Sequence, residues 1–132
     1  MQNDKILKKL ENSSGYFKHN NCHIISATTT GVEMRADLTE NSLNPYDTAH
    51  GGLIFGLGDT AMGMTIGQKA LTITADITYL KPGTGKYLTA KAKQIKAGQK
   101  ICFAECNIYN DKEELIATMS GSYYLIKEKE GK

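Results

Sequence analysis

Polar and apolar residues alternate with a period of two in the first third of the chain. Between residues 32 and 38 the apolar side chains occupy every second position, and charged residues lie between them. Alternation of this kind predicts a strand with one buried face. Ile24 and Ile25 belong to a preceding strand, and Thr30-Gly31 is the expected hairpin turn between the two.

The second half of the chain repeats this pattern, with turn residues between the apolar runs. Pro82-Gly83, Ala97-Gly98 and the 110–112 segment are the expected turns. The sequence therefore predicts four more strands, over residues 71–80, 86–95, 100–109 and 115–126.

Residues 1–15 form an N-terminal segment with an amphipathic helix expected over residues 3–12. A polar turn is expected at 16–21 and a loop at 40–48, because both are rich in turn-forming residues. Residues 127–132 are a charged tail.

One long helix is predicted between Gly51 and Gly67, the most apolar segment of the chain. Since it is apolar nearly all round, it should be buried on most faces. Its glycines weaken a helix interior by roughly 1 kcal/mol each, so we expect another backbone to approach closely at these positions. Asp59 within this run argues against a helix that faces lipid.

Many strands around one central helix are typical of an α+β protein, with one antiparallel sheet wrapped around that helix. With 132 residues and a mass of 14.5 kDa, the chain suits a single domain over 1–132.

The net charge of +2 is too small to indicate nucleic-acid binding. There is no apolar run long enough to span a membrane and no secretory signal. Three cysteines in such a chain indicate reduced thiols and a cytoplasmic protein.

The residues with the clearest chemical potential are Asp59 and the Gly51-Gly52 pair at the start of the predicted helix. A carboxylate inside an apolar helix needs hydrogen-bond partners, and a purely structural role is the plainer alternative. The free N–H groups of a helix N-terminus can stabilise a developing oxyanion, and glycine lets a ligand approach the backbone. A carboxylate and an oxyanion site together are the minimum that acyl transfer requires.

Gly51 and Asp59 are separated by eight residues, which is about 12 Å along one helix. One reacting carbonyl needs both groups within hydrogen-bonding distance. A two-fold dimer satisfies this requirement if Gly51 of one subunit lies opposite Asp59 of the other. The sequence therefore predicts a homodimer with composite active sites.

These residues resemble the signature of the hotdog-fold acyl-CoA thioesterases, in the phenylacetate-pathway (PaaI-type) branch of the 4-hydroxybenzoyl-CoA thioesterase superfamily. The resemblance covers roughly residues 20–126. It rests on Asn44, the His50-Gly51-Gly52 step and Leu57-x-Asp59, and is supported by the strand from Thr72 to Pro82 and by the Gly98-Gln-Lys100 turn.

The resemblance implies a helix enclosed by a curved sheet, dimers joined edge to edge, and tetramers built from pairs of dimers. It also implies an acyl-CoA substrate and a set of residue roles. Asp59 is the nucleophile or general base, Gly51 supplies the oxyanion N–H, Asn44 helps to place that end of the site, and Thr72 orients the carboxylate or the water. The chain departs from the family at Gly56, Gly58 and Gly63 of its helix, which could loosen or deepen the acyl pocket, and at Thr74, where the family often has an acidic residue.

Several other side chains are candidate binding groups for a substrate or a metal. His50 is either a base or a residue that fixes its loop by hydrogen bonding, and with Gly52 it is assigned to substrate binding. Lys81 and Lys100 lie beside turns and are assigned to the phosphates of CoA, whereas the other lysines of the second half are expected on a solvated face.

No metal or cofactor is expected, because the His19–His23 segment lacks a fourth ligand. Cys102 and Cys106 are expected in the core, about 13 Å apart on one strand face.

Two other functions remain open. A hotdog protein could instead hydrate or dehydrate an acyl thioester, with His50 as the base. Alternatively, the chain could bind or sense acyl-CoA without catalysis. The sequence leaves open the acyl group, the choice between CoA and a carrier protein, and the choice between a covalent and a general-base route.

Overall fold

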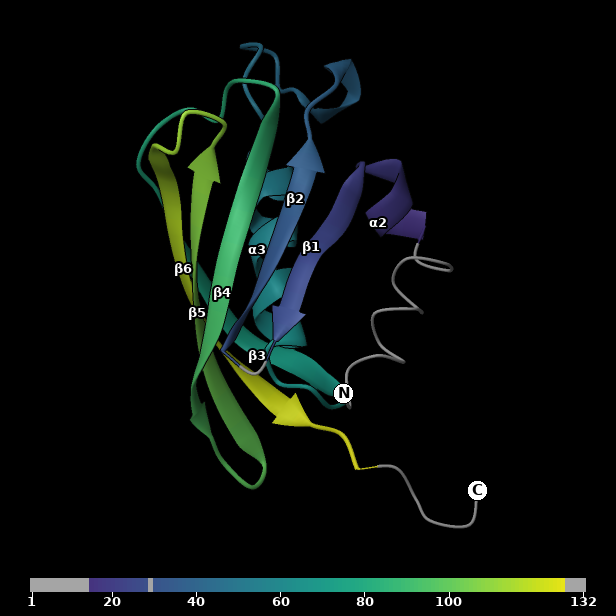
Figure 1. Ribbon diagram of the computed structural model, residues 1–132, viewed down its shortest axis with the longest axis vertical. Coiled ribbons are helices and arrows are strands. Elements are labelled where there is room, and N and C mark those ends of the chain that lie inside the picture. Colours follow the sequence, from purple (N-terminus) through teal and green to yellow (C-terminus); the bar gives the residue numbers. More distant parts are fainter. Residues whose placement is uncertain (1–14, 29, 128–132) are drawn as a thin grey trace.

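The computed structural model describes residues 15–28 and 30–127. A six-stranded antiparallel sheet curves around one long helix (Figure 1). Across the sheet the strands follow the order β1-β2-β4-β5-β6-β3. The α+β class and the hotdog architecture expected from the sequence are confirmed. The elements are α2 Gly15–His19, β1 Cys22–Thr28, β2 Gly31–Asp37, the 3-10 turn η1 Glu40–Ser42, α3 Gly51–Met64, β3 Ala70–Tyr79, β4 Tyr87–Ala97, β5 Ile101–Asn110 and β6 Leu115–Leu125.

The core lies between α3 and the concave face of the sheet. The alternation predicted for residues 32–38 is confirmed, because β2 buries every second side chain. Met34 on β2, Leu88 on β4 and Ile108 on β5 are fully buried, as are Ala61 and Met62 on α3. The alternating apolar positions of the strands thus supply one wall of the core, and the apolar helix fills it.

The glycines of α3 lie where neighbouring side chains press against the helix. A Cβ at Gly58 would overlap the Met119 sulfur and lie 3.1 Å from Ile108 Cδ1, and a Cβ at Gly56 would overlap the hydroxyl of Tyr16. The expected approach of another backbone is therefore wrong at these two positions, because side chains make the close approach. Since these side chains occupy the space beside Gly56 and Gly58, the two glycines do not by themselves deepen a pocket.

Helix α3 ends at Met64, three residues before the predicted end. The Thr65 hydroxyl donates to the carbonyl of Met62, and Gly67 adopts a positive φ of 74°. A residue in this left-handed conformation redirects the chain after a helix, which explains the early end.

The prediction of a turn over residues 16–21 is wrong for its first part, because Gly15–His19 form the short helix α2. Phe17 is buried in the core cluster, so tertiary packing holds a turn of helix that local propensity does not favour. Asn20 and Asn21 then make the expected turn. The helix expected over 3–12 and the tail beyond residue 127 lie outside the described residues.

Among residues 15–28 and 30–127, strand β3 is an edge of the sheet and pairs with β6 alone. Large apolar side chains lie exposed on or next to it: Leu71, Ile73, Tyr79 and Leu80. An exposed apolar edge strand offers unpaired backbone groups to another strand. In the described part of the chain, no helix has the length and apolar character needed to cross a membrane.

Candidate active site

Asp59 lies on α3 and its carboxylate faces β3 and β6. Thr72 Oγ1 on β3 donates a hydrogen bond to Asp59 Oδ1 over 2.9 Å, and the Tyr123 hydroxyl on β6 donates to the same oxygen over 2.9 Å. Oδ2 has no hydrogen bond from any residue that the structure describes. The carboxylate therefore has one oxygen held by two hydroxyls and one oxygen left for other chemistry.

Tyr123 was not identified from the sequence. It is 1% exposed, and its hydroxyl also lies 3.2 Å from the backbone carbonyl oxygen of Asp59. Burial, and after it the charge of Asp59, raises the pKa of the Tyr123 phenol far above its usual value. An inward-facing tyrosine on a strand looks like any core aromatic, and 64 residues separate it from Asp59, so no local signal marks it.

The N-terminus of α3 leaves one backbone amide free. His50 caps the helix: its Nδ1 accepts from the Gly52 N–H over 2.9 Å, and its carbonyl accepts from the N–H groups of Leu53 and Ile54. The Gly51 N–H has no acceptor among the described residues. It is thus available to an oxygen at the positive end of the helix dipole.

Gly51 is also fixed from the sheet. The Tyr79 hydroxyl at the end of β3 donates to the Gly51 carbonyl over 2.7 Å. A Cβ at Gly51 would lie 3.2 Å from that hydroxyl, and a Cβ at Gly52 would lie 3.2 Å from His50 Nδ1. A side chain at either glycine would therefore crowd its neighbour. Because neither residue has a side chain, the Gly51 amide stays accessible.

Asn44 organises the loop that leads into α3. Its side-chain oxygen accepts from the N–H groups of Tyr46 and Thr48, and its Nδ2 donates to Thr48 Oγ1 over 2.8 Å. After this loop, the Ala49 N–H donates to the Gly83 carbonyl over 2.7 Å. The side chain that the resemblance places at this end of the site thus shapes the approach to Gly51.

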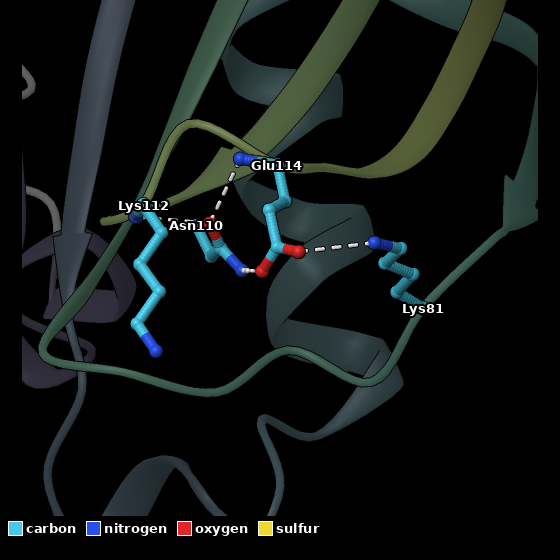
Figure 2. A network of polar contacts seen from close by, with 4 residues as sticks. All are labelled: Lys81, Asn110, Lys112 and Glu114. Atoms are coloured by element: carbon cyan, nitrogen blue, oxygen red, sulfur yellow. Dashed lines mark hydrogen bonds and ion pairs between the residues drawn. The ribbon is translucent and has the colours of Figure 1, made fainter.

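Lys81 takes part in a polar network near the start of β6 (Figure 2). Its Nζ lies 3.0 Å from Glu114 Oε2, and Asn110 Nδ2 donates to Glu114 Oε1 over 2.8 Å. The hydrogen bond from Asn110, followed by the contact with Lys81, lowers the pKa of Glu114. The assigned phosphate ligand is therefore already paired with a carboxylate within the chain.

Lys100 lies in the turn between β4 and β5, and its carbonyl accepts from Leu125 at the end of β6, whereas the Lys81 N–H donates to Ile116 near the start of β6. The two lysines therefore lie at opposite ends of the sheet. A strand of this length spans about 30 Å. One subunit therefore does not bring these two lysines together.

Thr74 and the two cysteines of β5 are the other residues that the sequence singles out, and none of them is hydrogen-bonded to Asp59 in the described part of the chain. Thr74 shares a hydrogen bond of 2.7 Å with Ser122 across β3 and β6. Cys102 and Cys106 are free, buried thiols, as expected from the sequence. Within residues 15–28 and 30–127 there is no cluster of three His, Cys, Asp or Glu side chains suited to a metal ion.

Comparison with known proteins agrees with the fold. The family model of the thioesterase superfamily matches residues 46–117. A protein of Archaeoglobus fulgidus with a provisional esterase name is 36% identical over 131 residues, covering 96% of this chain and 79% of the relative. The acyl-coenzyme A thioesterase PaaI of Escherichia coli is 26% identical over 129 residues, covering 90% of this chain and 92% of PaaI.

The solved structure of the E. coli PaaI protein from the phenylacetic acid degradation operon superposes with a TM-score of 0.88 at 23% identity, covering 96% of this chain and 94% of that chain. This likeness supports the hotdog fold. Together with the family match over the segment that holds Gly51 and Asp59, it leads to one conclusion: the chain belongs to the thioesterase superfamily and is a hotdog thioesterase of the PaaI type.

Proposed function

We propose that this chain hydrolyses acyl-CoA thioesters to a free acid and CoA, with Asp59 as the reacting side chain and the Gly51 N–H as the oxyanion donor. The observation that carries the proposal is the Asp59 carboxylate, with Oδ1 held by Thr72 and Tyr123 and Oδ2 free of hydrogen bonds from the described residues. The acyl-CoA substrate is inferred from PaaI, which is named for this activity.

In the proposed mechanism the thioester carbonyl oxygen accepts the Gly51 N–H, and the helix dipole stabilises the negative charge that grows there. In the covalent route Oδ2 attacks the carbonyl carbon, the CoA thiolate leaves, and water then hydrolyses the acyl-aspartate anhydride. In the general-base route Oδ2 takes a proton from a water molecule as that water attacks. Both routes use the same residues.

We place the two groups together in a homodimer joined through β3. Thr72, next to Asp59, lies near the start of this edge strand, and Tyr79, next to Gly51, lies at its end. Antiparallel pairing of two copies of β3 about a two-fold axis sets the start of each strand beside the end of the other. Each Asp59 then approaches the Gly51 amide of the partner subunit, which removes the separation of about 12 Å within one helix.

Substrate binding is proposed for the remaining residues of the site. His50 keeps a ring N–H at Nε2 for the ligand, because Nδ1 accepts from Gly52, and the exposed Gly52 allows close approach. In the proposed dimer the phosphates of one CoA meet Lys81 of one subunit and Lys100 of the other, since the two lysines lie at opposite ends of each sheet. Asn44 keeps the loop beside Gly51 in place.

The proposal also covers the assembly of the dimers and the cellular compartment. A tetramer is proposed as a pair of these dimers, on the resemblance to the PaaI-type family. A cytoplasmic setting is proposed on the three buried cysteines, which are free thiols.

The test is release of free CoA, followed with a thiol-reactive dye over a panel of aromatic, short-chain and long-chain acyl-CoAs. Asp59→Asn should lower kcat by at least about 100-fold. The matched control is Asp37→Asn, which changes an exposed carboxylate at the end of β2 and should retain wild-type activity.

Equal CoA release by the wild type and Asp59→Asn would remove Asp59 from the mechanism. A wild type that binds CoA tightly but releases no thiol from any acyl-CoA would favour a sensor. Consumption of an unsaturated or 3-hydroxyacyl thioester without thiol release would favour hydration or dehydration with His50 as the base.

A further inference from the structure

We infer that Tyr123 is a positioning residue of this active site: its hydroxyl fixes the rotation of the Asp59 carboxylate so that one oxygen stays bound to the two hydroxyls and the other faces the reacting carbonyl. The inference rests on the proposed function, in which Asp59 reacts, and adds a residue that neither the sequence motifs nor the comparisons assign.

The first argument is the origin of the two hydrogen bonds on Oδ1. Thr72 and Tyr123 are direct register partners in adjacent antiparallel strands, and both donate to the same carboxylate oxygen over 2.9 Å. A carboxylate with one donor can rotate about its last torsion over a wide range. Two donors fixed by one strand pair narrow that range, because a rotation away from this orientation would weaken both hydrogen bonds at once.

The second argument is the rigidity of the tyrosine itself. The ring lies between the helix and the sheet and is 1% exposed. Glycines on both sides leave room for it, since a Cβ added at Gly63 on α3 or at Gly121 on β6 would lie 3.5 Å or 3.1 Å from its ring carbons. Close packing in the core holds such a buried ring in one orientation. The packed core therefore holds the Tyr123 hydroxyl beside Asp59, whereas Thr72 donates from an exposed edge strand.

The third argument is the pair of acceptors within reach of the hydroxyl. Its single proton can be donated to Asp59 Oδ1, at 2.9 Å, or to the Asp59 backbone carbonyl, at 3.2 Å. The raised pKa of the phenol keeps that proton in place at neutral pH. When the carboxylate loses its charge during the reaction, by acylation or by taking a proton, the backbone carbonyl remains as an acceptor and the buried hydroxyl stays satisfied.

The test compares Tyr123→Phe with Tyr124→Phe. Both changes remove one hydroxyl from neighbouring residues of β6, but Tyr124 faces away from Asp59 and is 46% exposed. Tyr123→Phe should lower kcat by about 10-fold with KM within about twofold, and should move the acid limb of the kcat/KM pH profile about one unit higher, because the ionised carboxylate loses a donor. Tyr124→Phe should match the wild type.

A structural role for Tyr123 alone would leave the pH profile in place. Wild-type kcat and pH dependence in Tyr123→Phe, with Asp59→Asn inactive, would overturn the inference and leave the proposed function standing. Full activity in Asp59→Asn would instead remove the proposed function and this inference with it. In the Asp59→Asn background, Tyr123→Phe should cause no further loss of rate.

A second replacement keeps the test decisive if Tyr123→Phe fails to fold. Incorporation of 3,5-difluorotyrosine at position 123 retains the ring and the hydroxyl but makes the phenol a stronger donor. The acid limb should then move to lower pH, opposite to the shift expected for phenylalanine. An unchanged acid limb in the fluorinated protein would overturn the inference.

Discussion

At the scale of single residues, the most informative feature is a carboxylate on a mostly apolar helix. Removing a carboxylate from water is unfavourable, and each hydrogen bond to a charged group returns roughly 1.5–3 kcal/mol. Asp59 is half-buried and, among the described residues, receives two such bonds, both on Oδ1. Oδ2 is therefore open to a substrate or a water molecule, as a reacting carboxylate requires.

The cysteines give a prediction at the same scale. Burial raises the pKa of Cys22 to about 11 and that of Cys106 to about 12, both above the unfolded value of about 9. The unfolded state therefore loses these protons first as pH rises. We expect the free energy of unfolding to fall by roughly 2 kcal/mol between pH 8 and pH 10, measured by urea denaturation.

At pH 8 the native protein should also resist thiol-reactive dyes, whereas the protein in urea should react at three cysteines. This difference matters for the CoA-release assay, which uses the same dyes. Immediate reaction of the native cysteines would contradict the burial seen in the structure.

Single residues were predictable from the sequence where the chemistry was local. Asp59 stands out inside an apolar run, and the Gly51-Gly52 step stands at a predicted helix start. Tyr123 and Tyr79 do not stand out, because both act through tertiary hydrogen bonds across 64 and 28 residues. Only the register of β3 against β6 and the packing of α3 show these contacts.

At the scale of elements, the strands were predicted to within about two residues because a half-buried sheet imposes a period of two. The position of helix α3 was predicted from the length of its apolar segment. Its end depends on the positive φ of Gly67, which the pattern of apolar residues does not show. Helix α2 was missed because a single turn of helix is stabilised by the burial of Phe17 and not by its own propensity.

The glycines of α3 give a matched pair of predictions. Gly58→Ala should destabilise the protein by about 1–3 kcal/mol, because the new methyl group would overlap Met119 and press on Ile108 in the filled core. Gly63→Ala should stabilise it by about 0.5–1 kcal/mol, since its Cβ would meet the Tyr123 ring at an ordinary 3.5 Å and alanine favours the helix.

Chemical denaturation of the two variants beside the wild type measures both effects. Opposite signs are expected, although the substitution is the same and the helix is the same. Equal destabilisation would show that α3 does not tolerate a methyl group at either position, contrary to the packing described here.

At the scale of the whole molecule, the described part of the chain leaves one edge of the sheet open. Leu71 and Ile73 on β3 are 63% and 50% exposed, and within the described residues this strand has a hydrogen-bonded neighbour on one side only. The same strand borders both Asp59, through Thr72, and Gly51, through Tyr79. Closing this edge with a second copy would therefore assemble the active site and cover the apolar side chains in one step.

Mixed dimers test this arrangement directly. Gly51→Pro removes the free N–H at a position where a helix tolerates proline, and His50, with φ of −62° and ψ of 136°, already has the conformation that a residue before proline needs. Gly51→Pro and Asp59→Asn should each be inactive alone. When the two chains are co-expressed with different tags, about half of the dimers are mixed, and each mixed dimer has one site with an intact Asp59 facing an intact Gly51, so activity should return to about a quarter of the wild-type value. If Asp59 and Gly51 of the same chain formed the site, every site in the mixture would lack one group, and no activity would return.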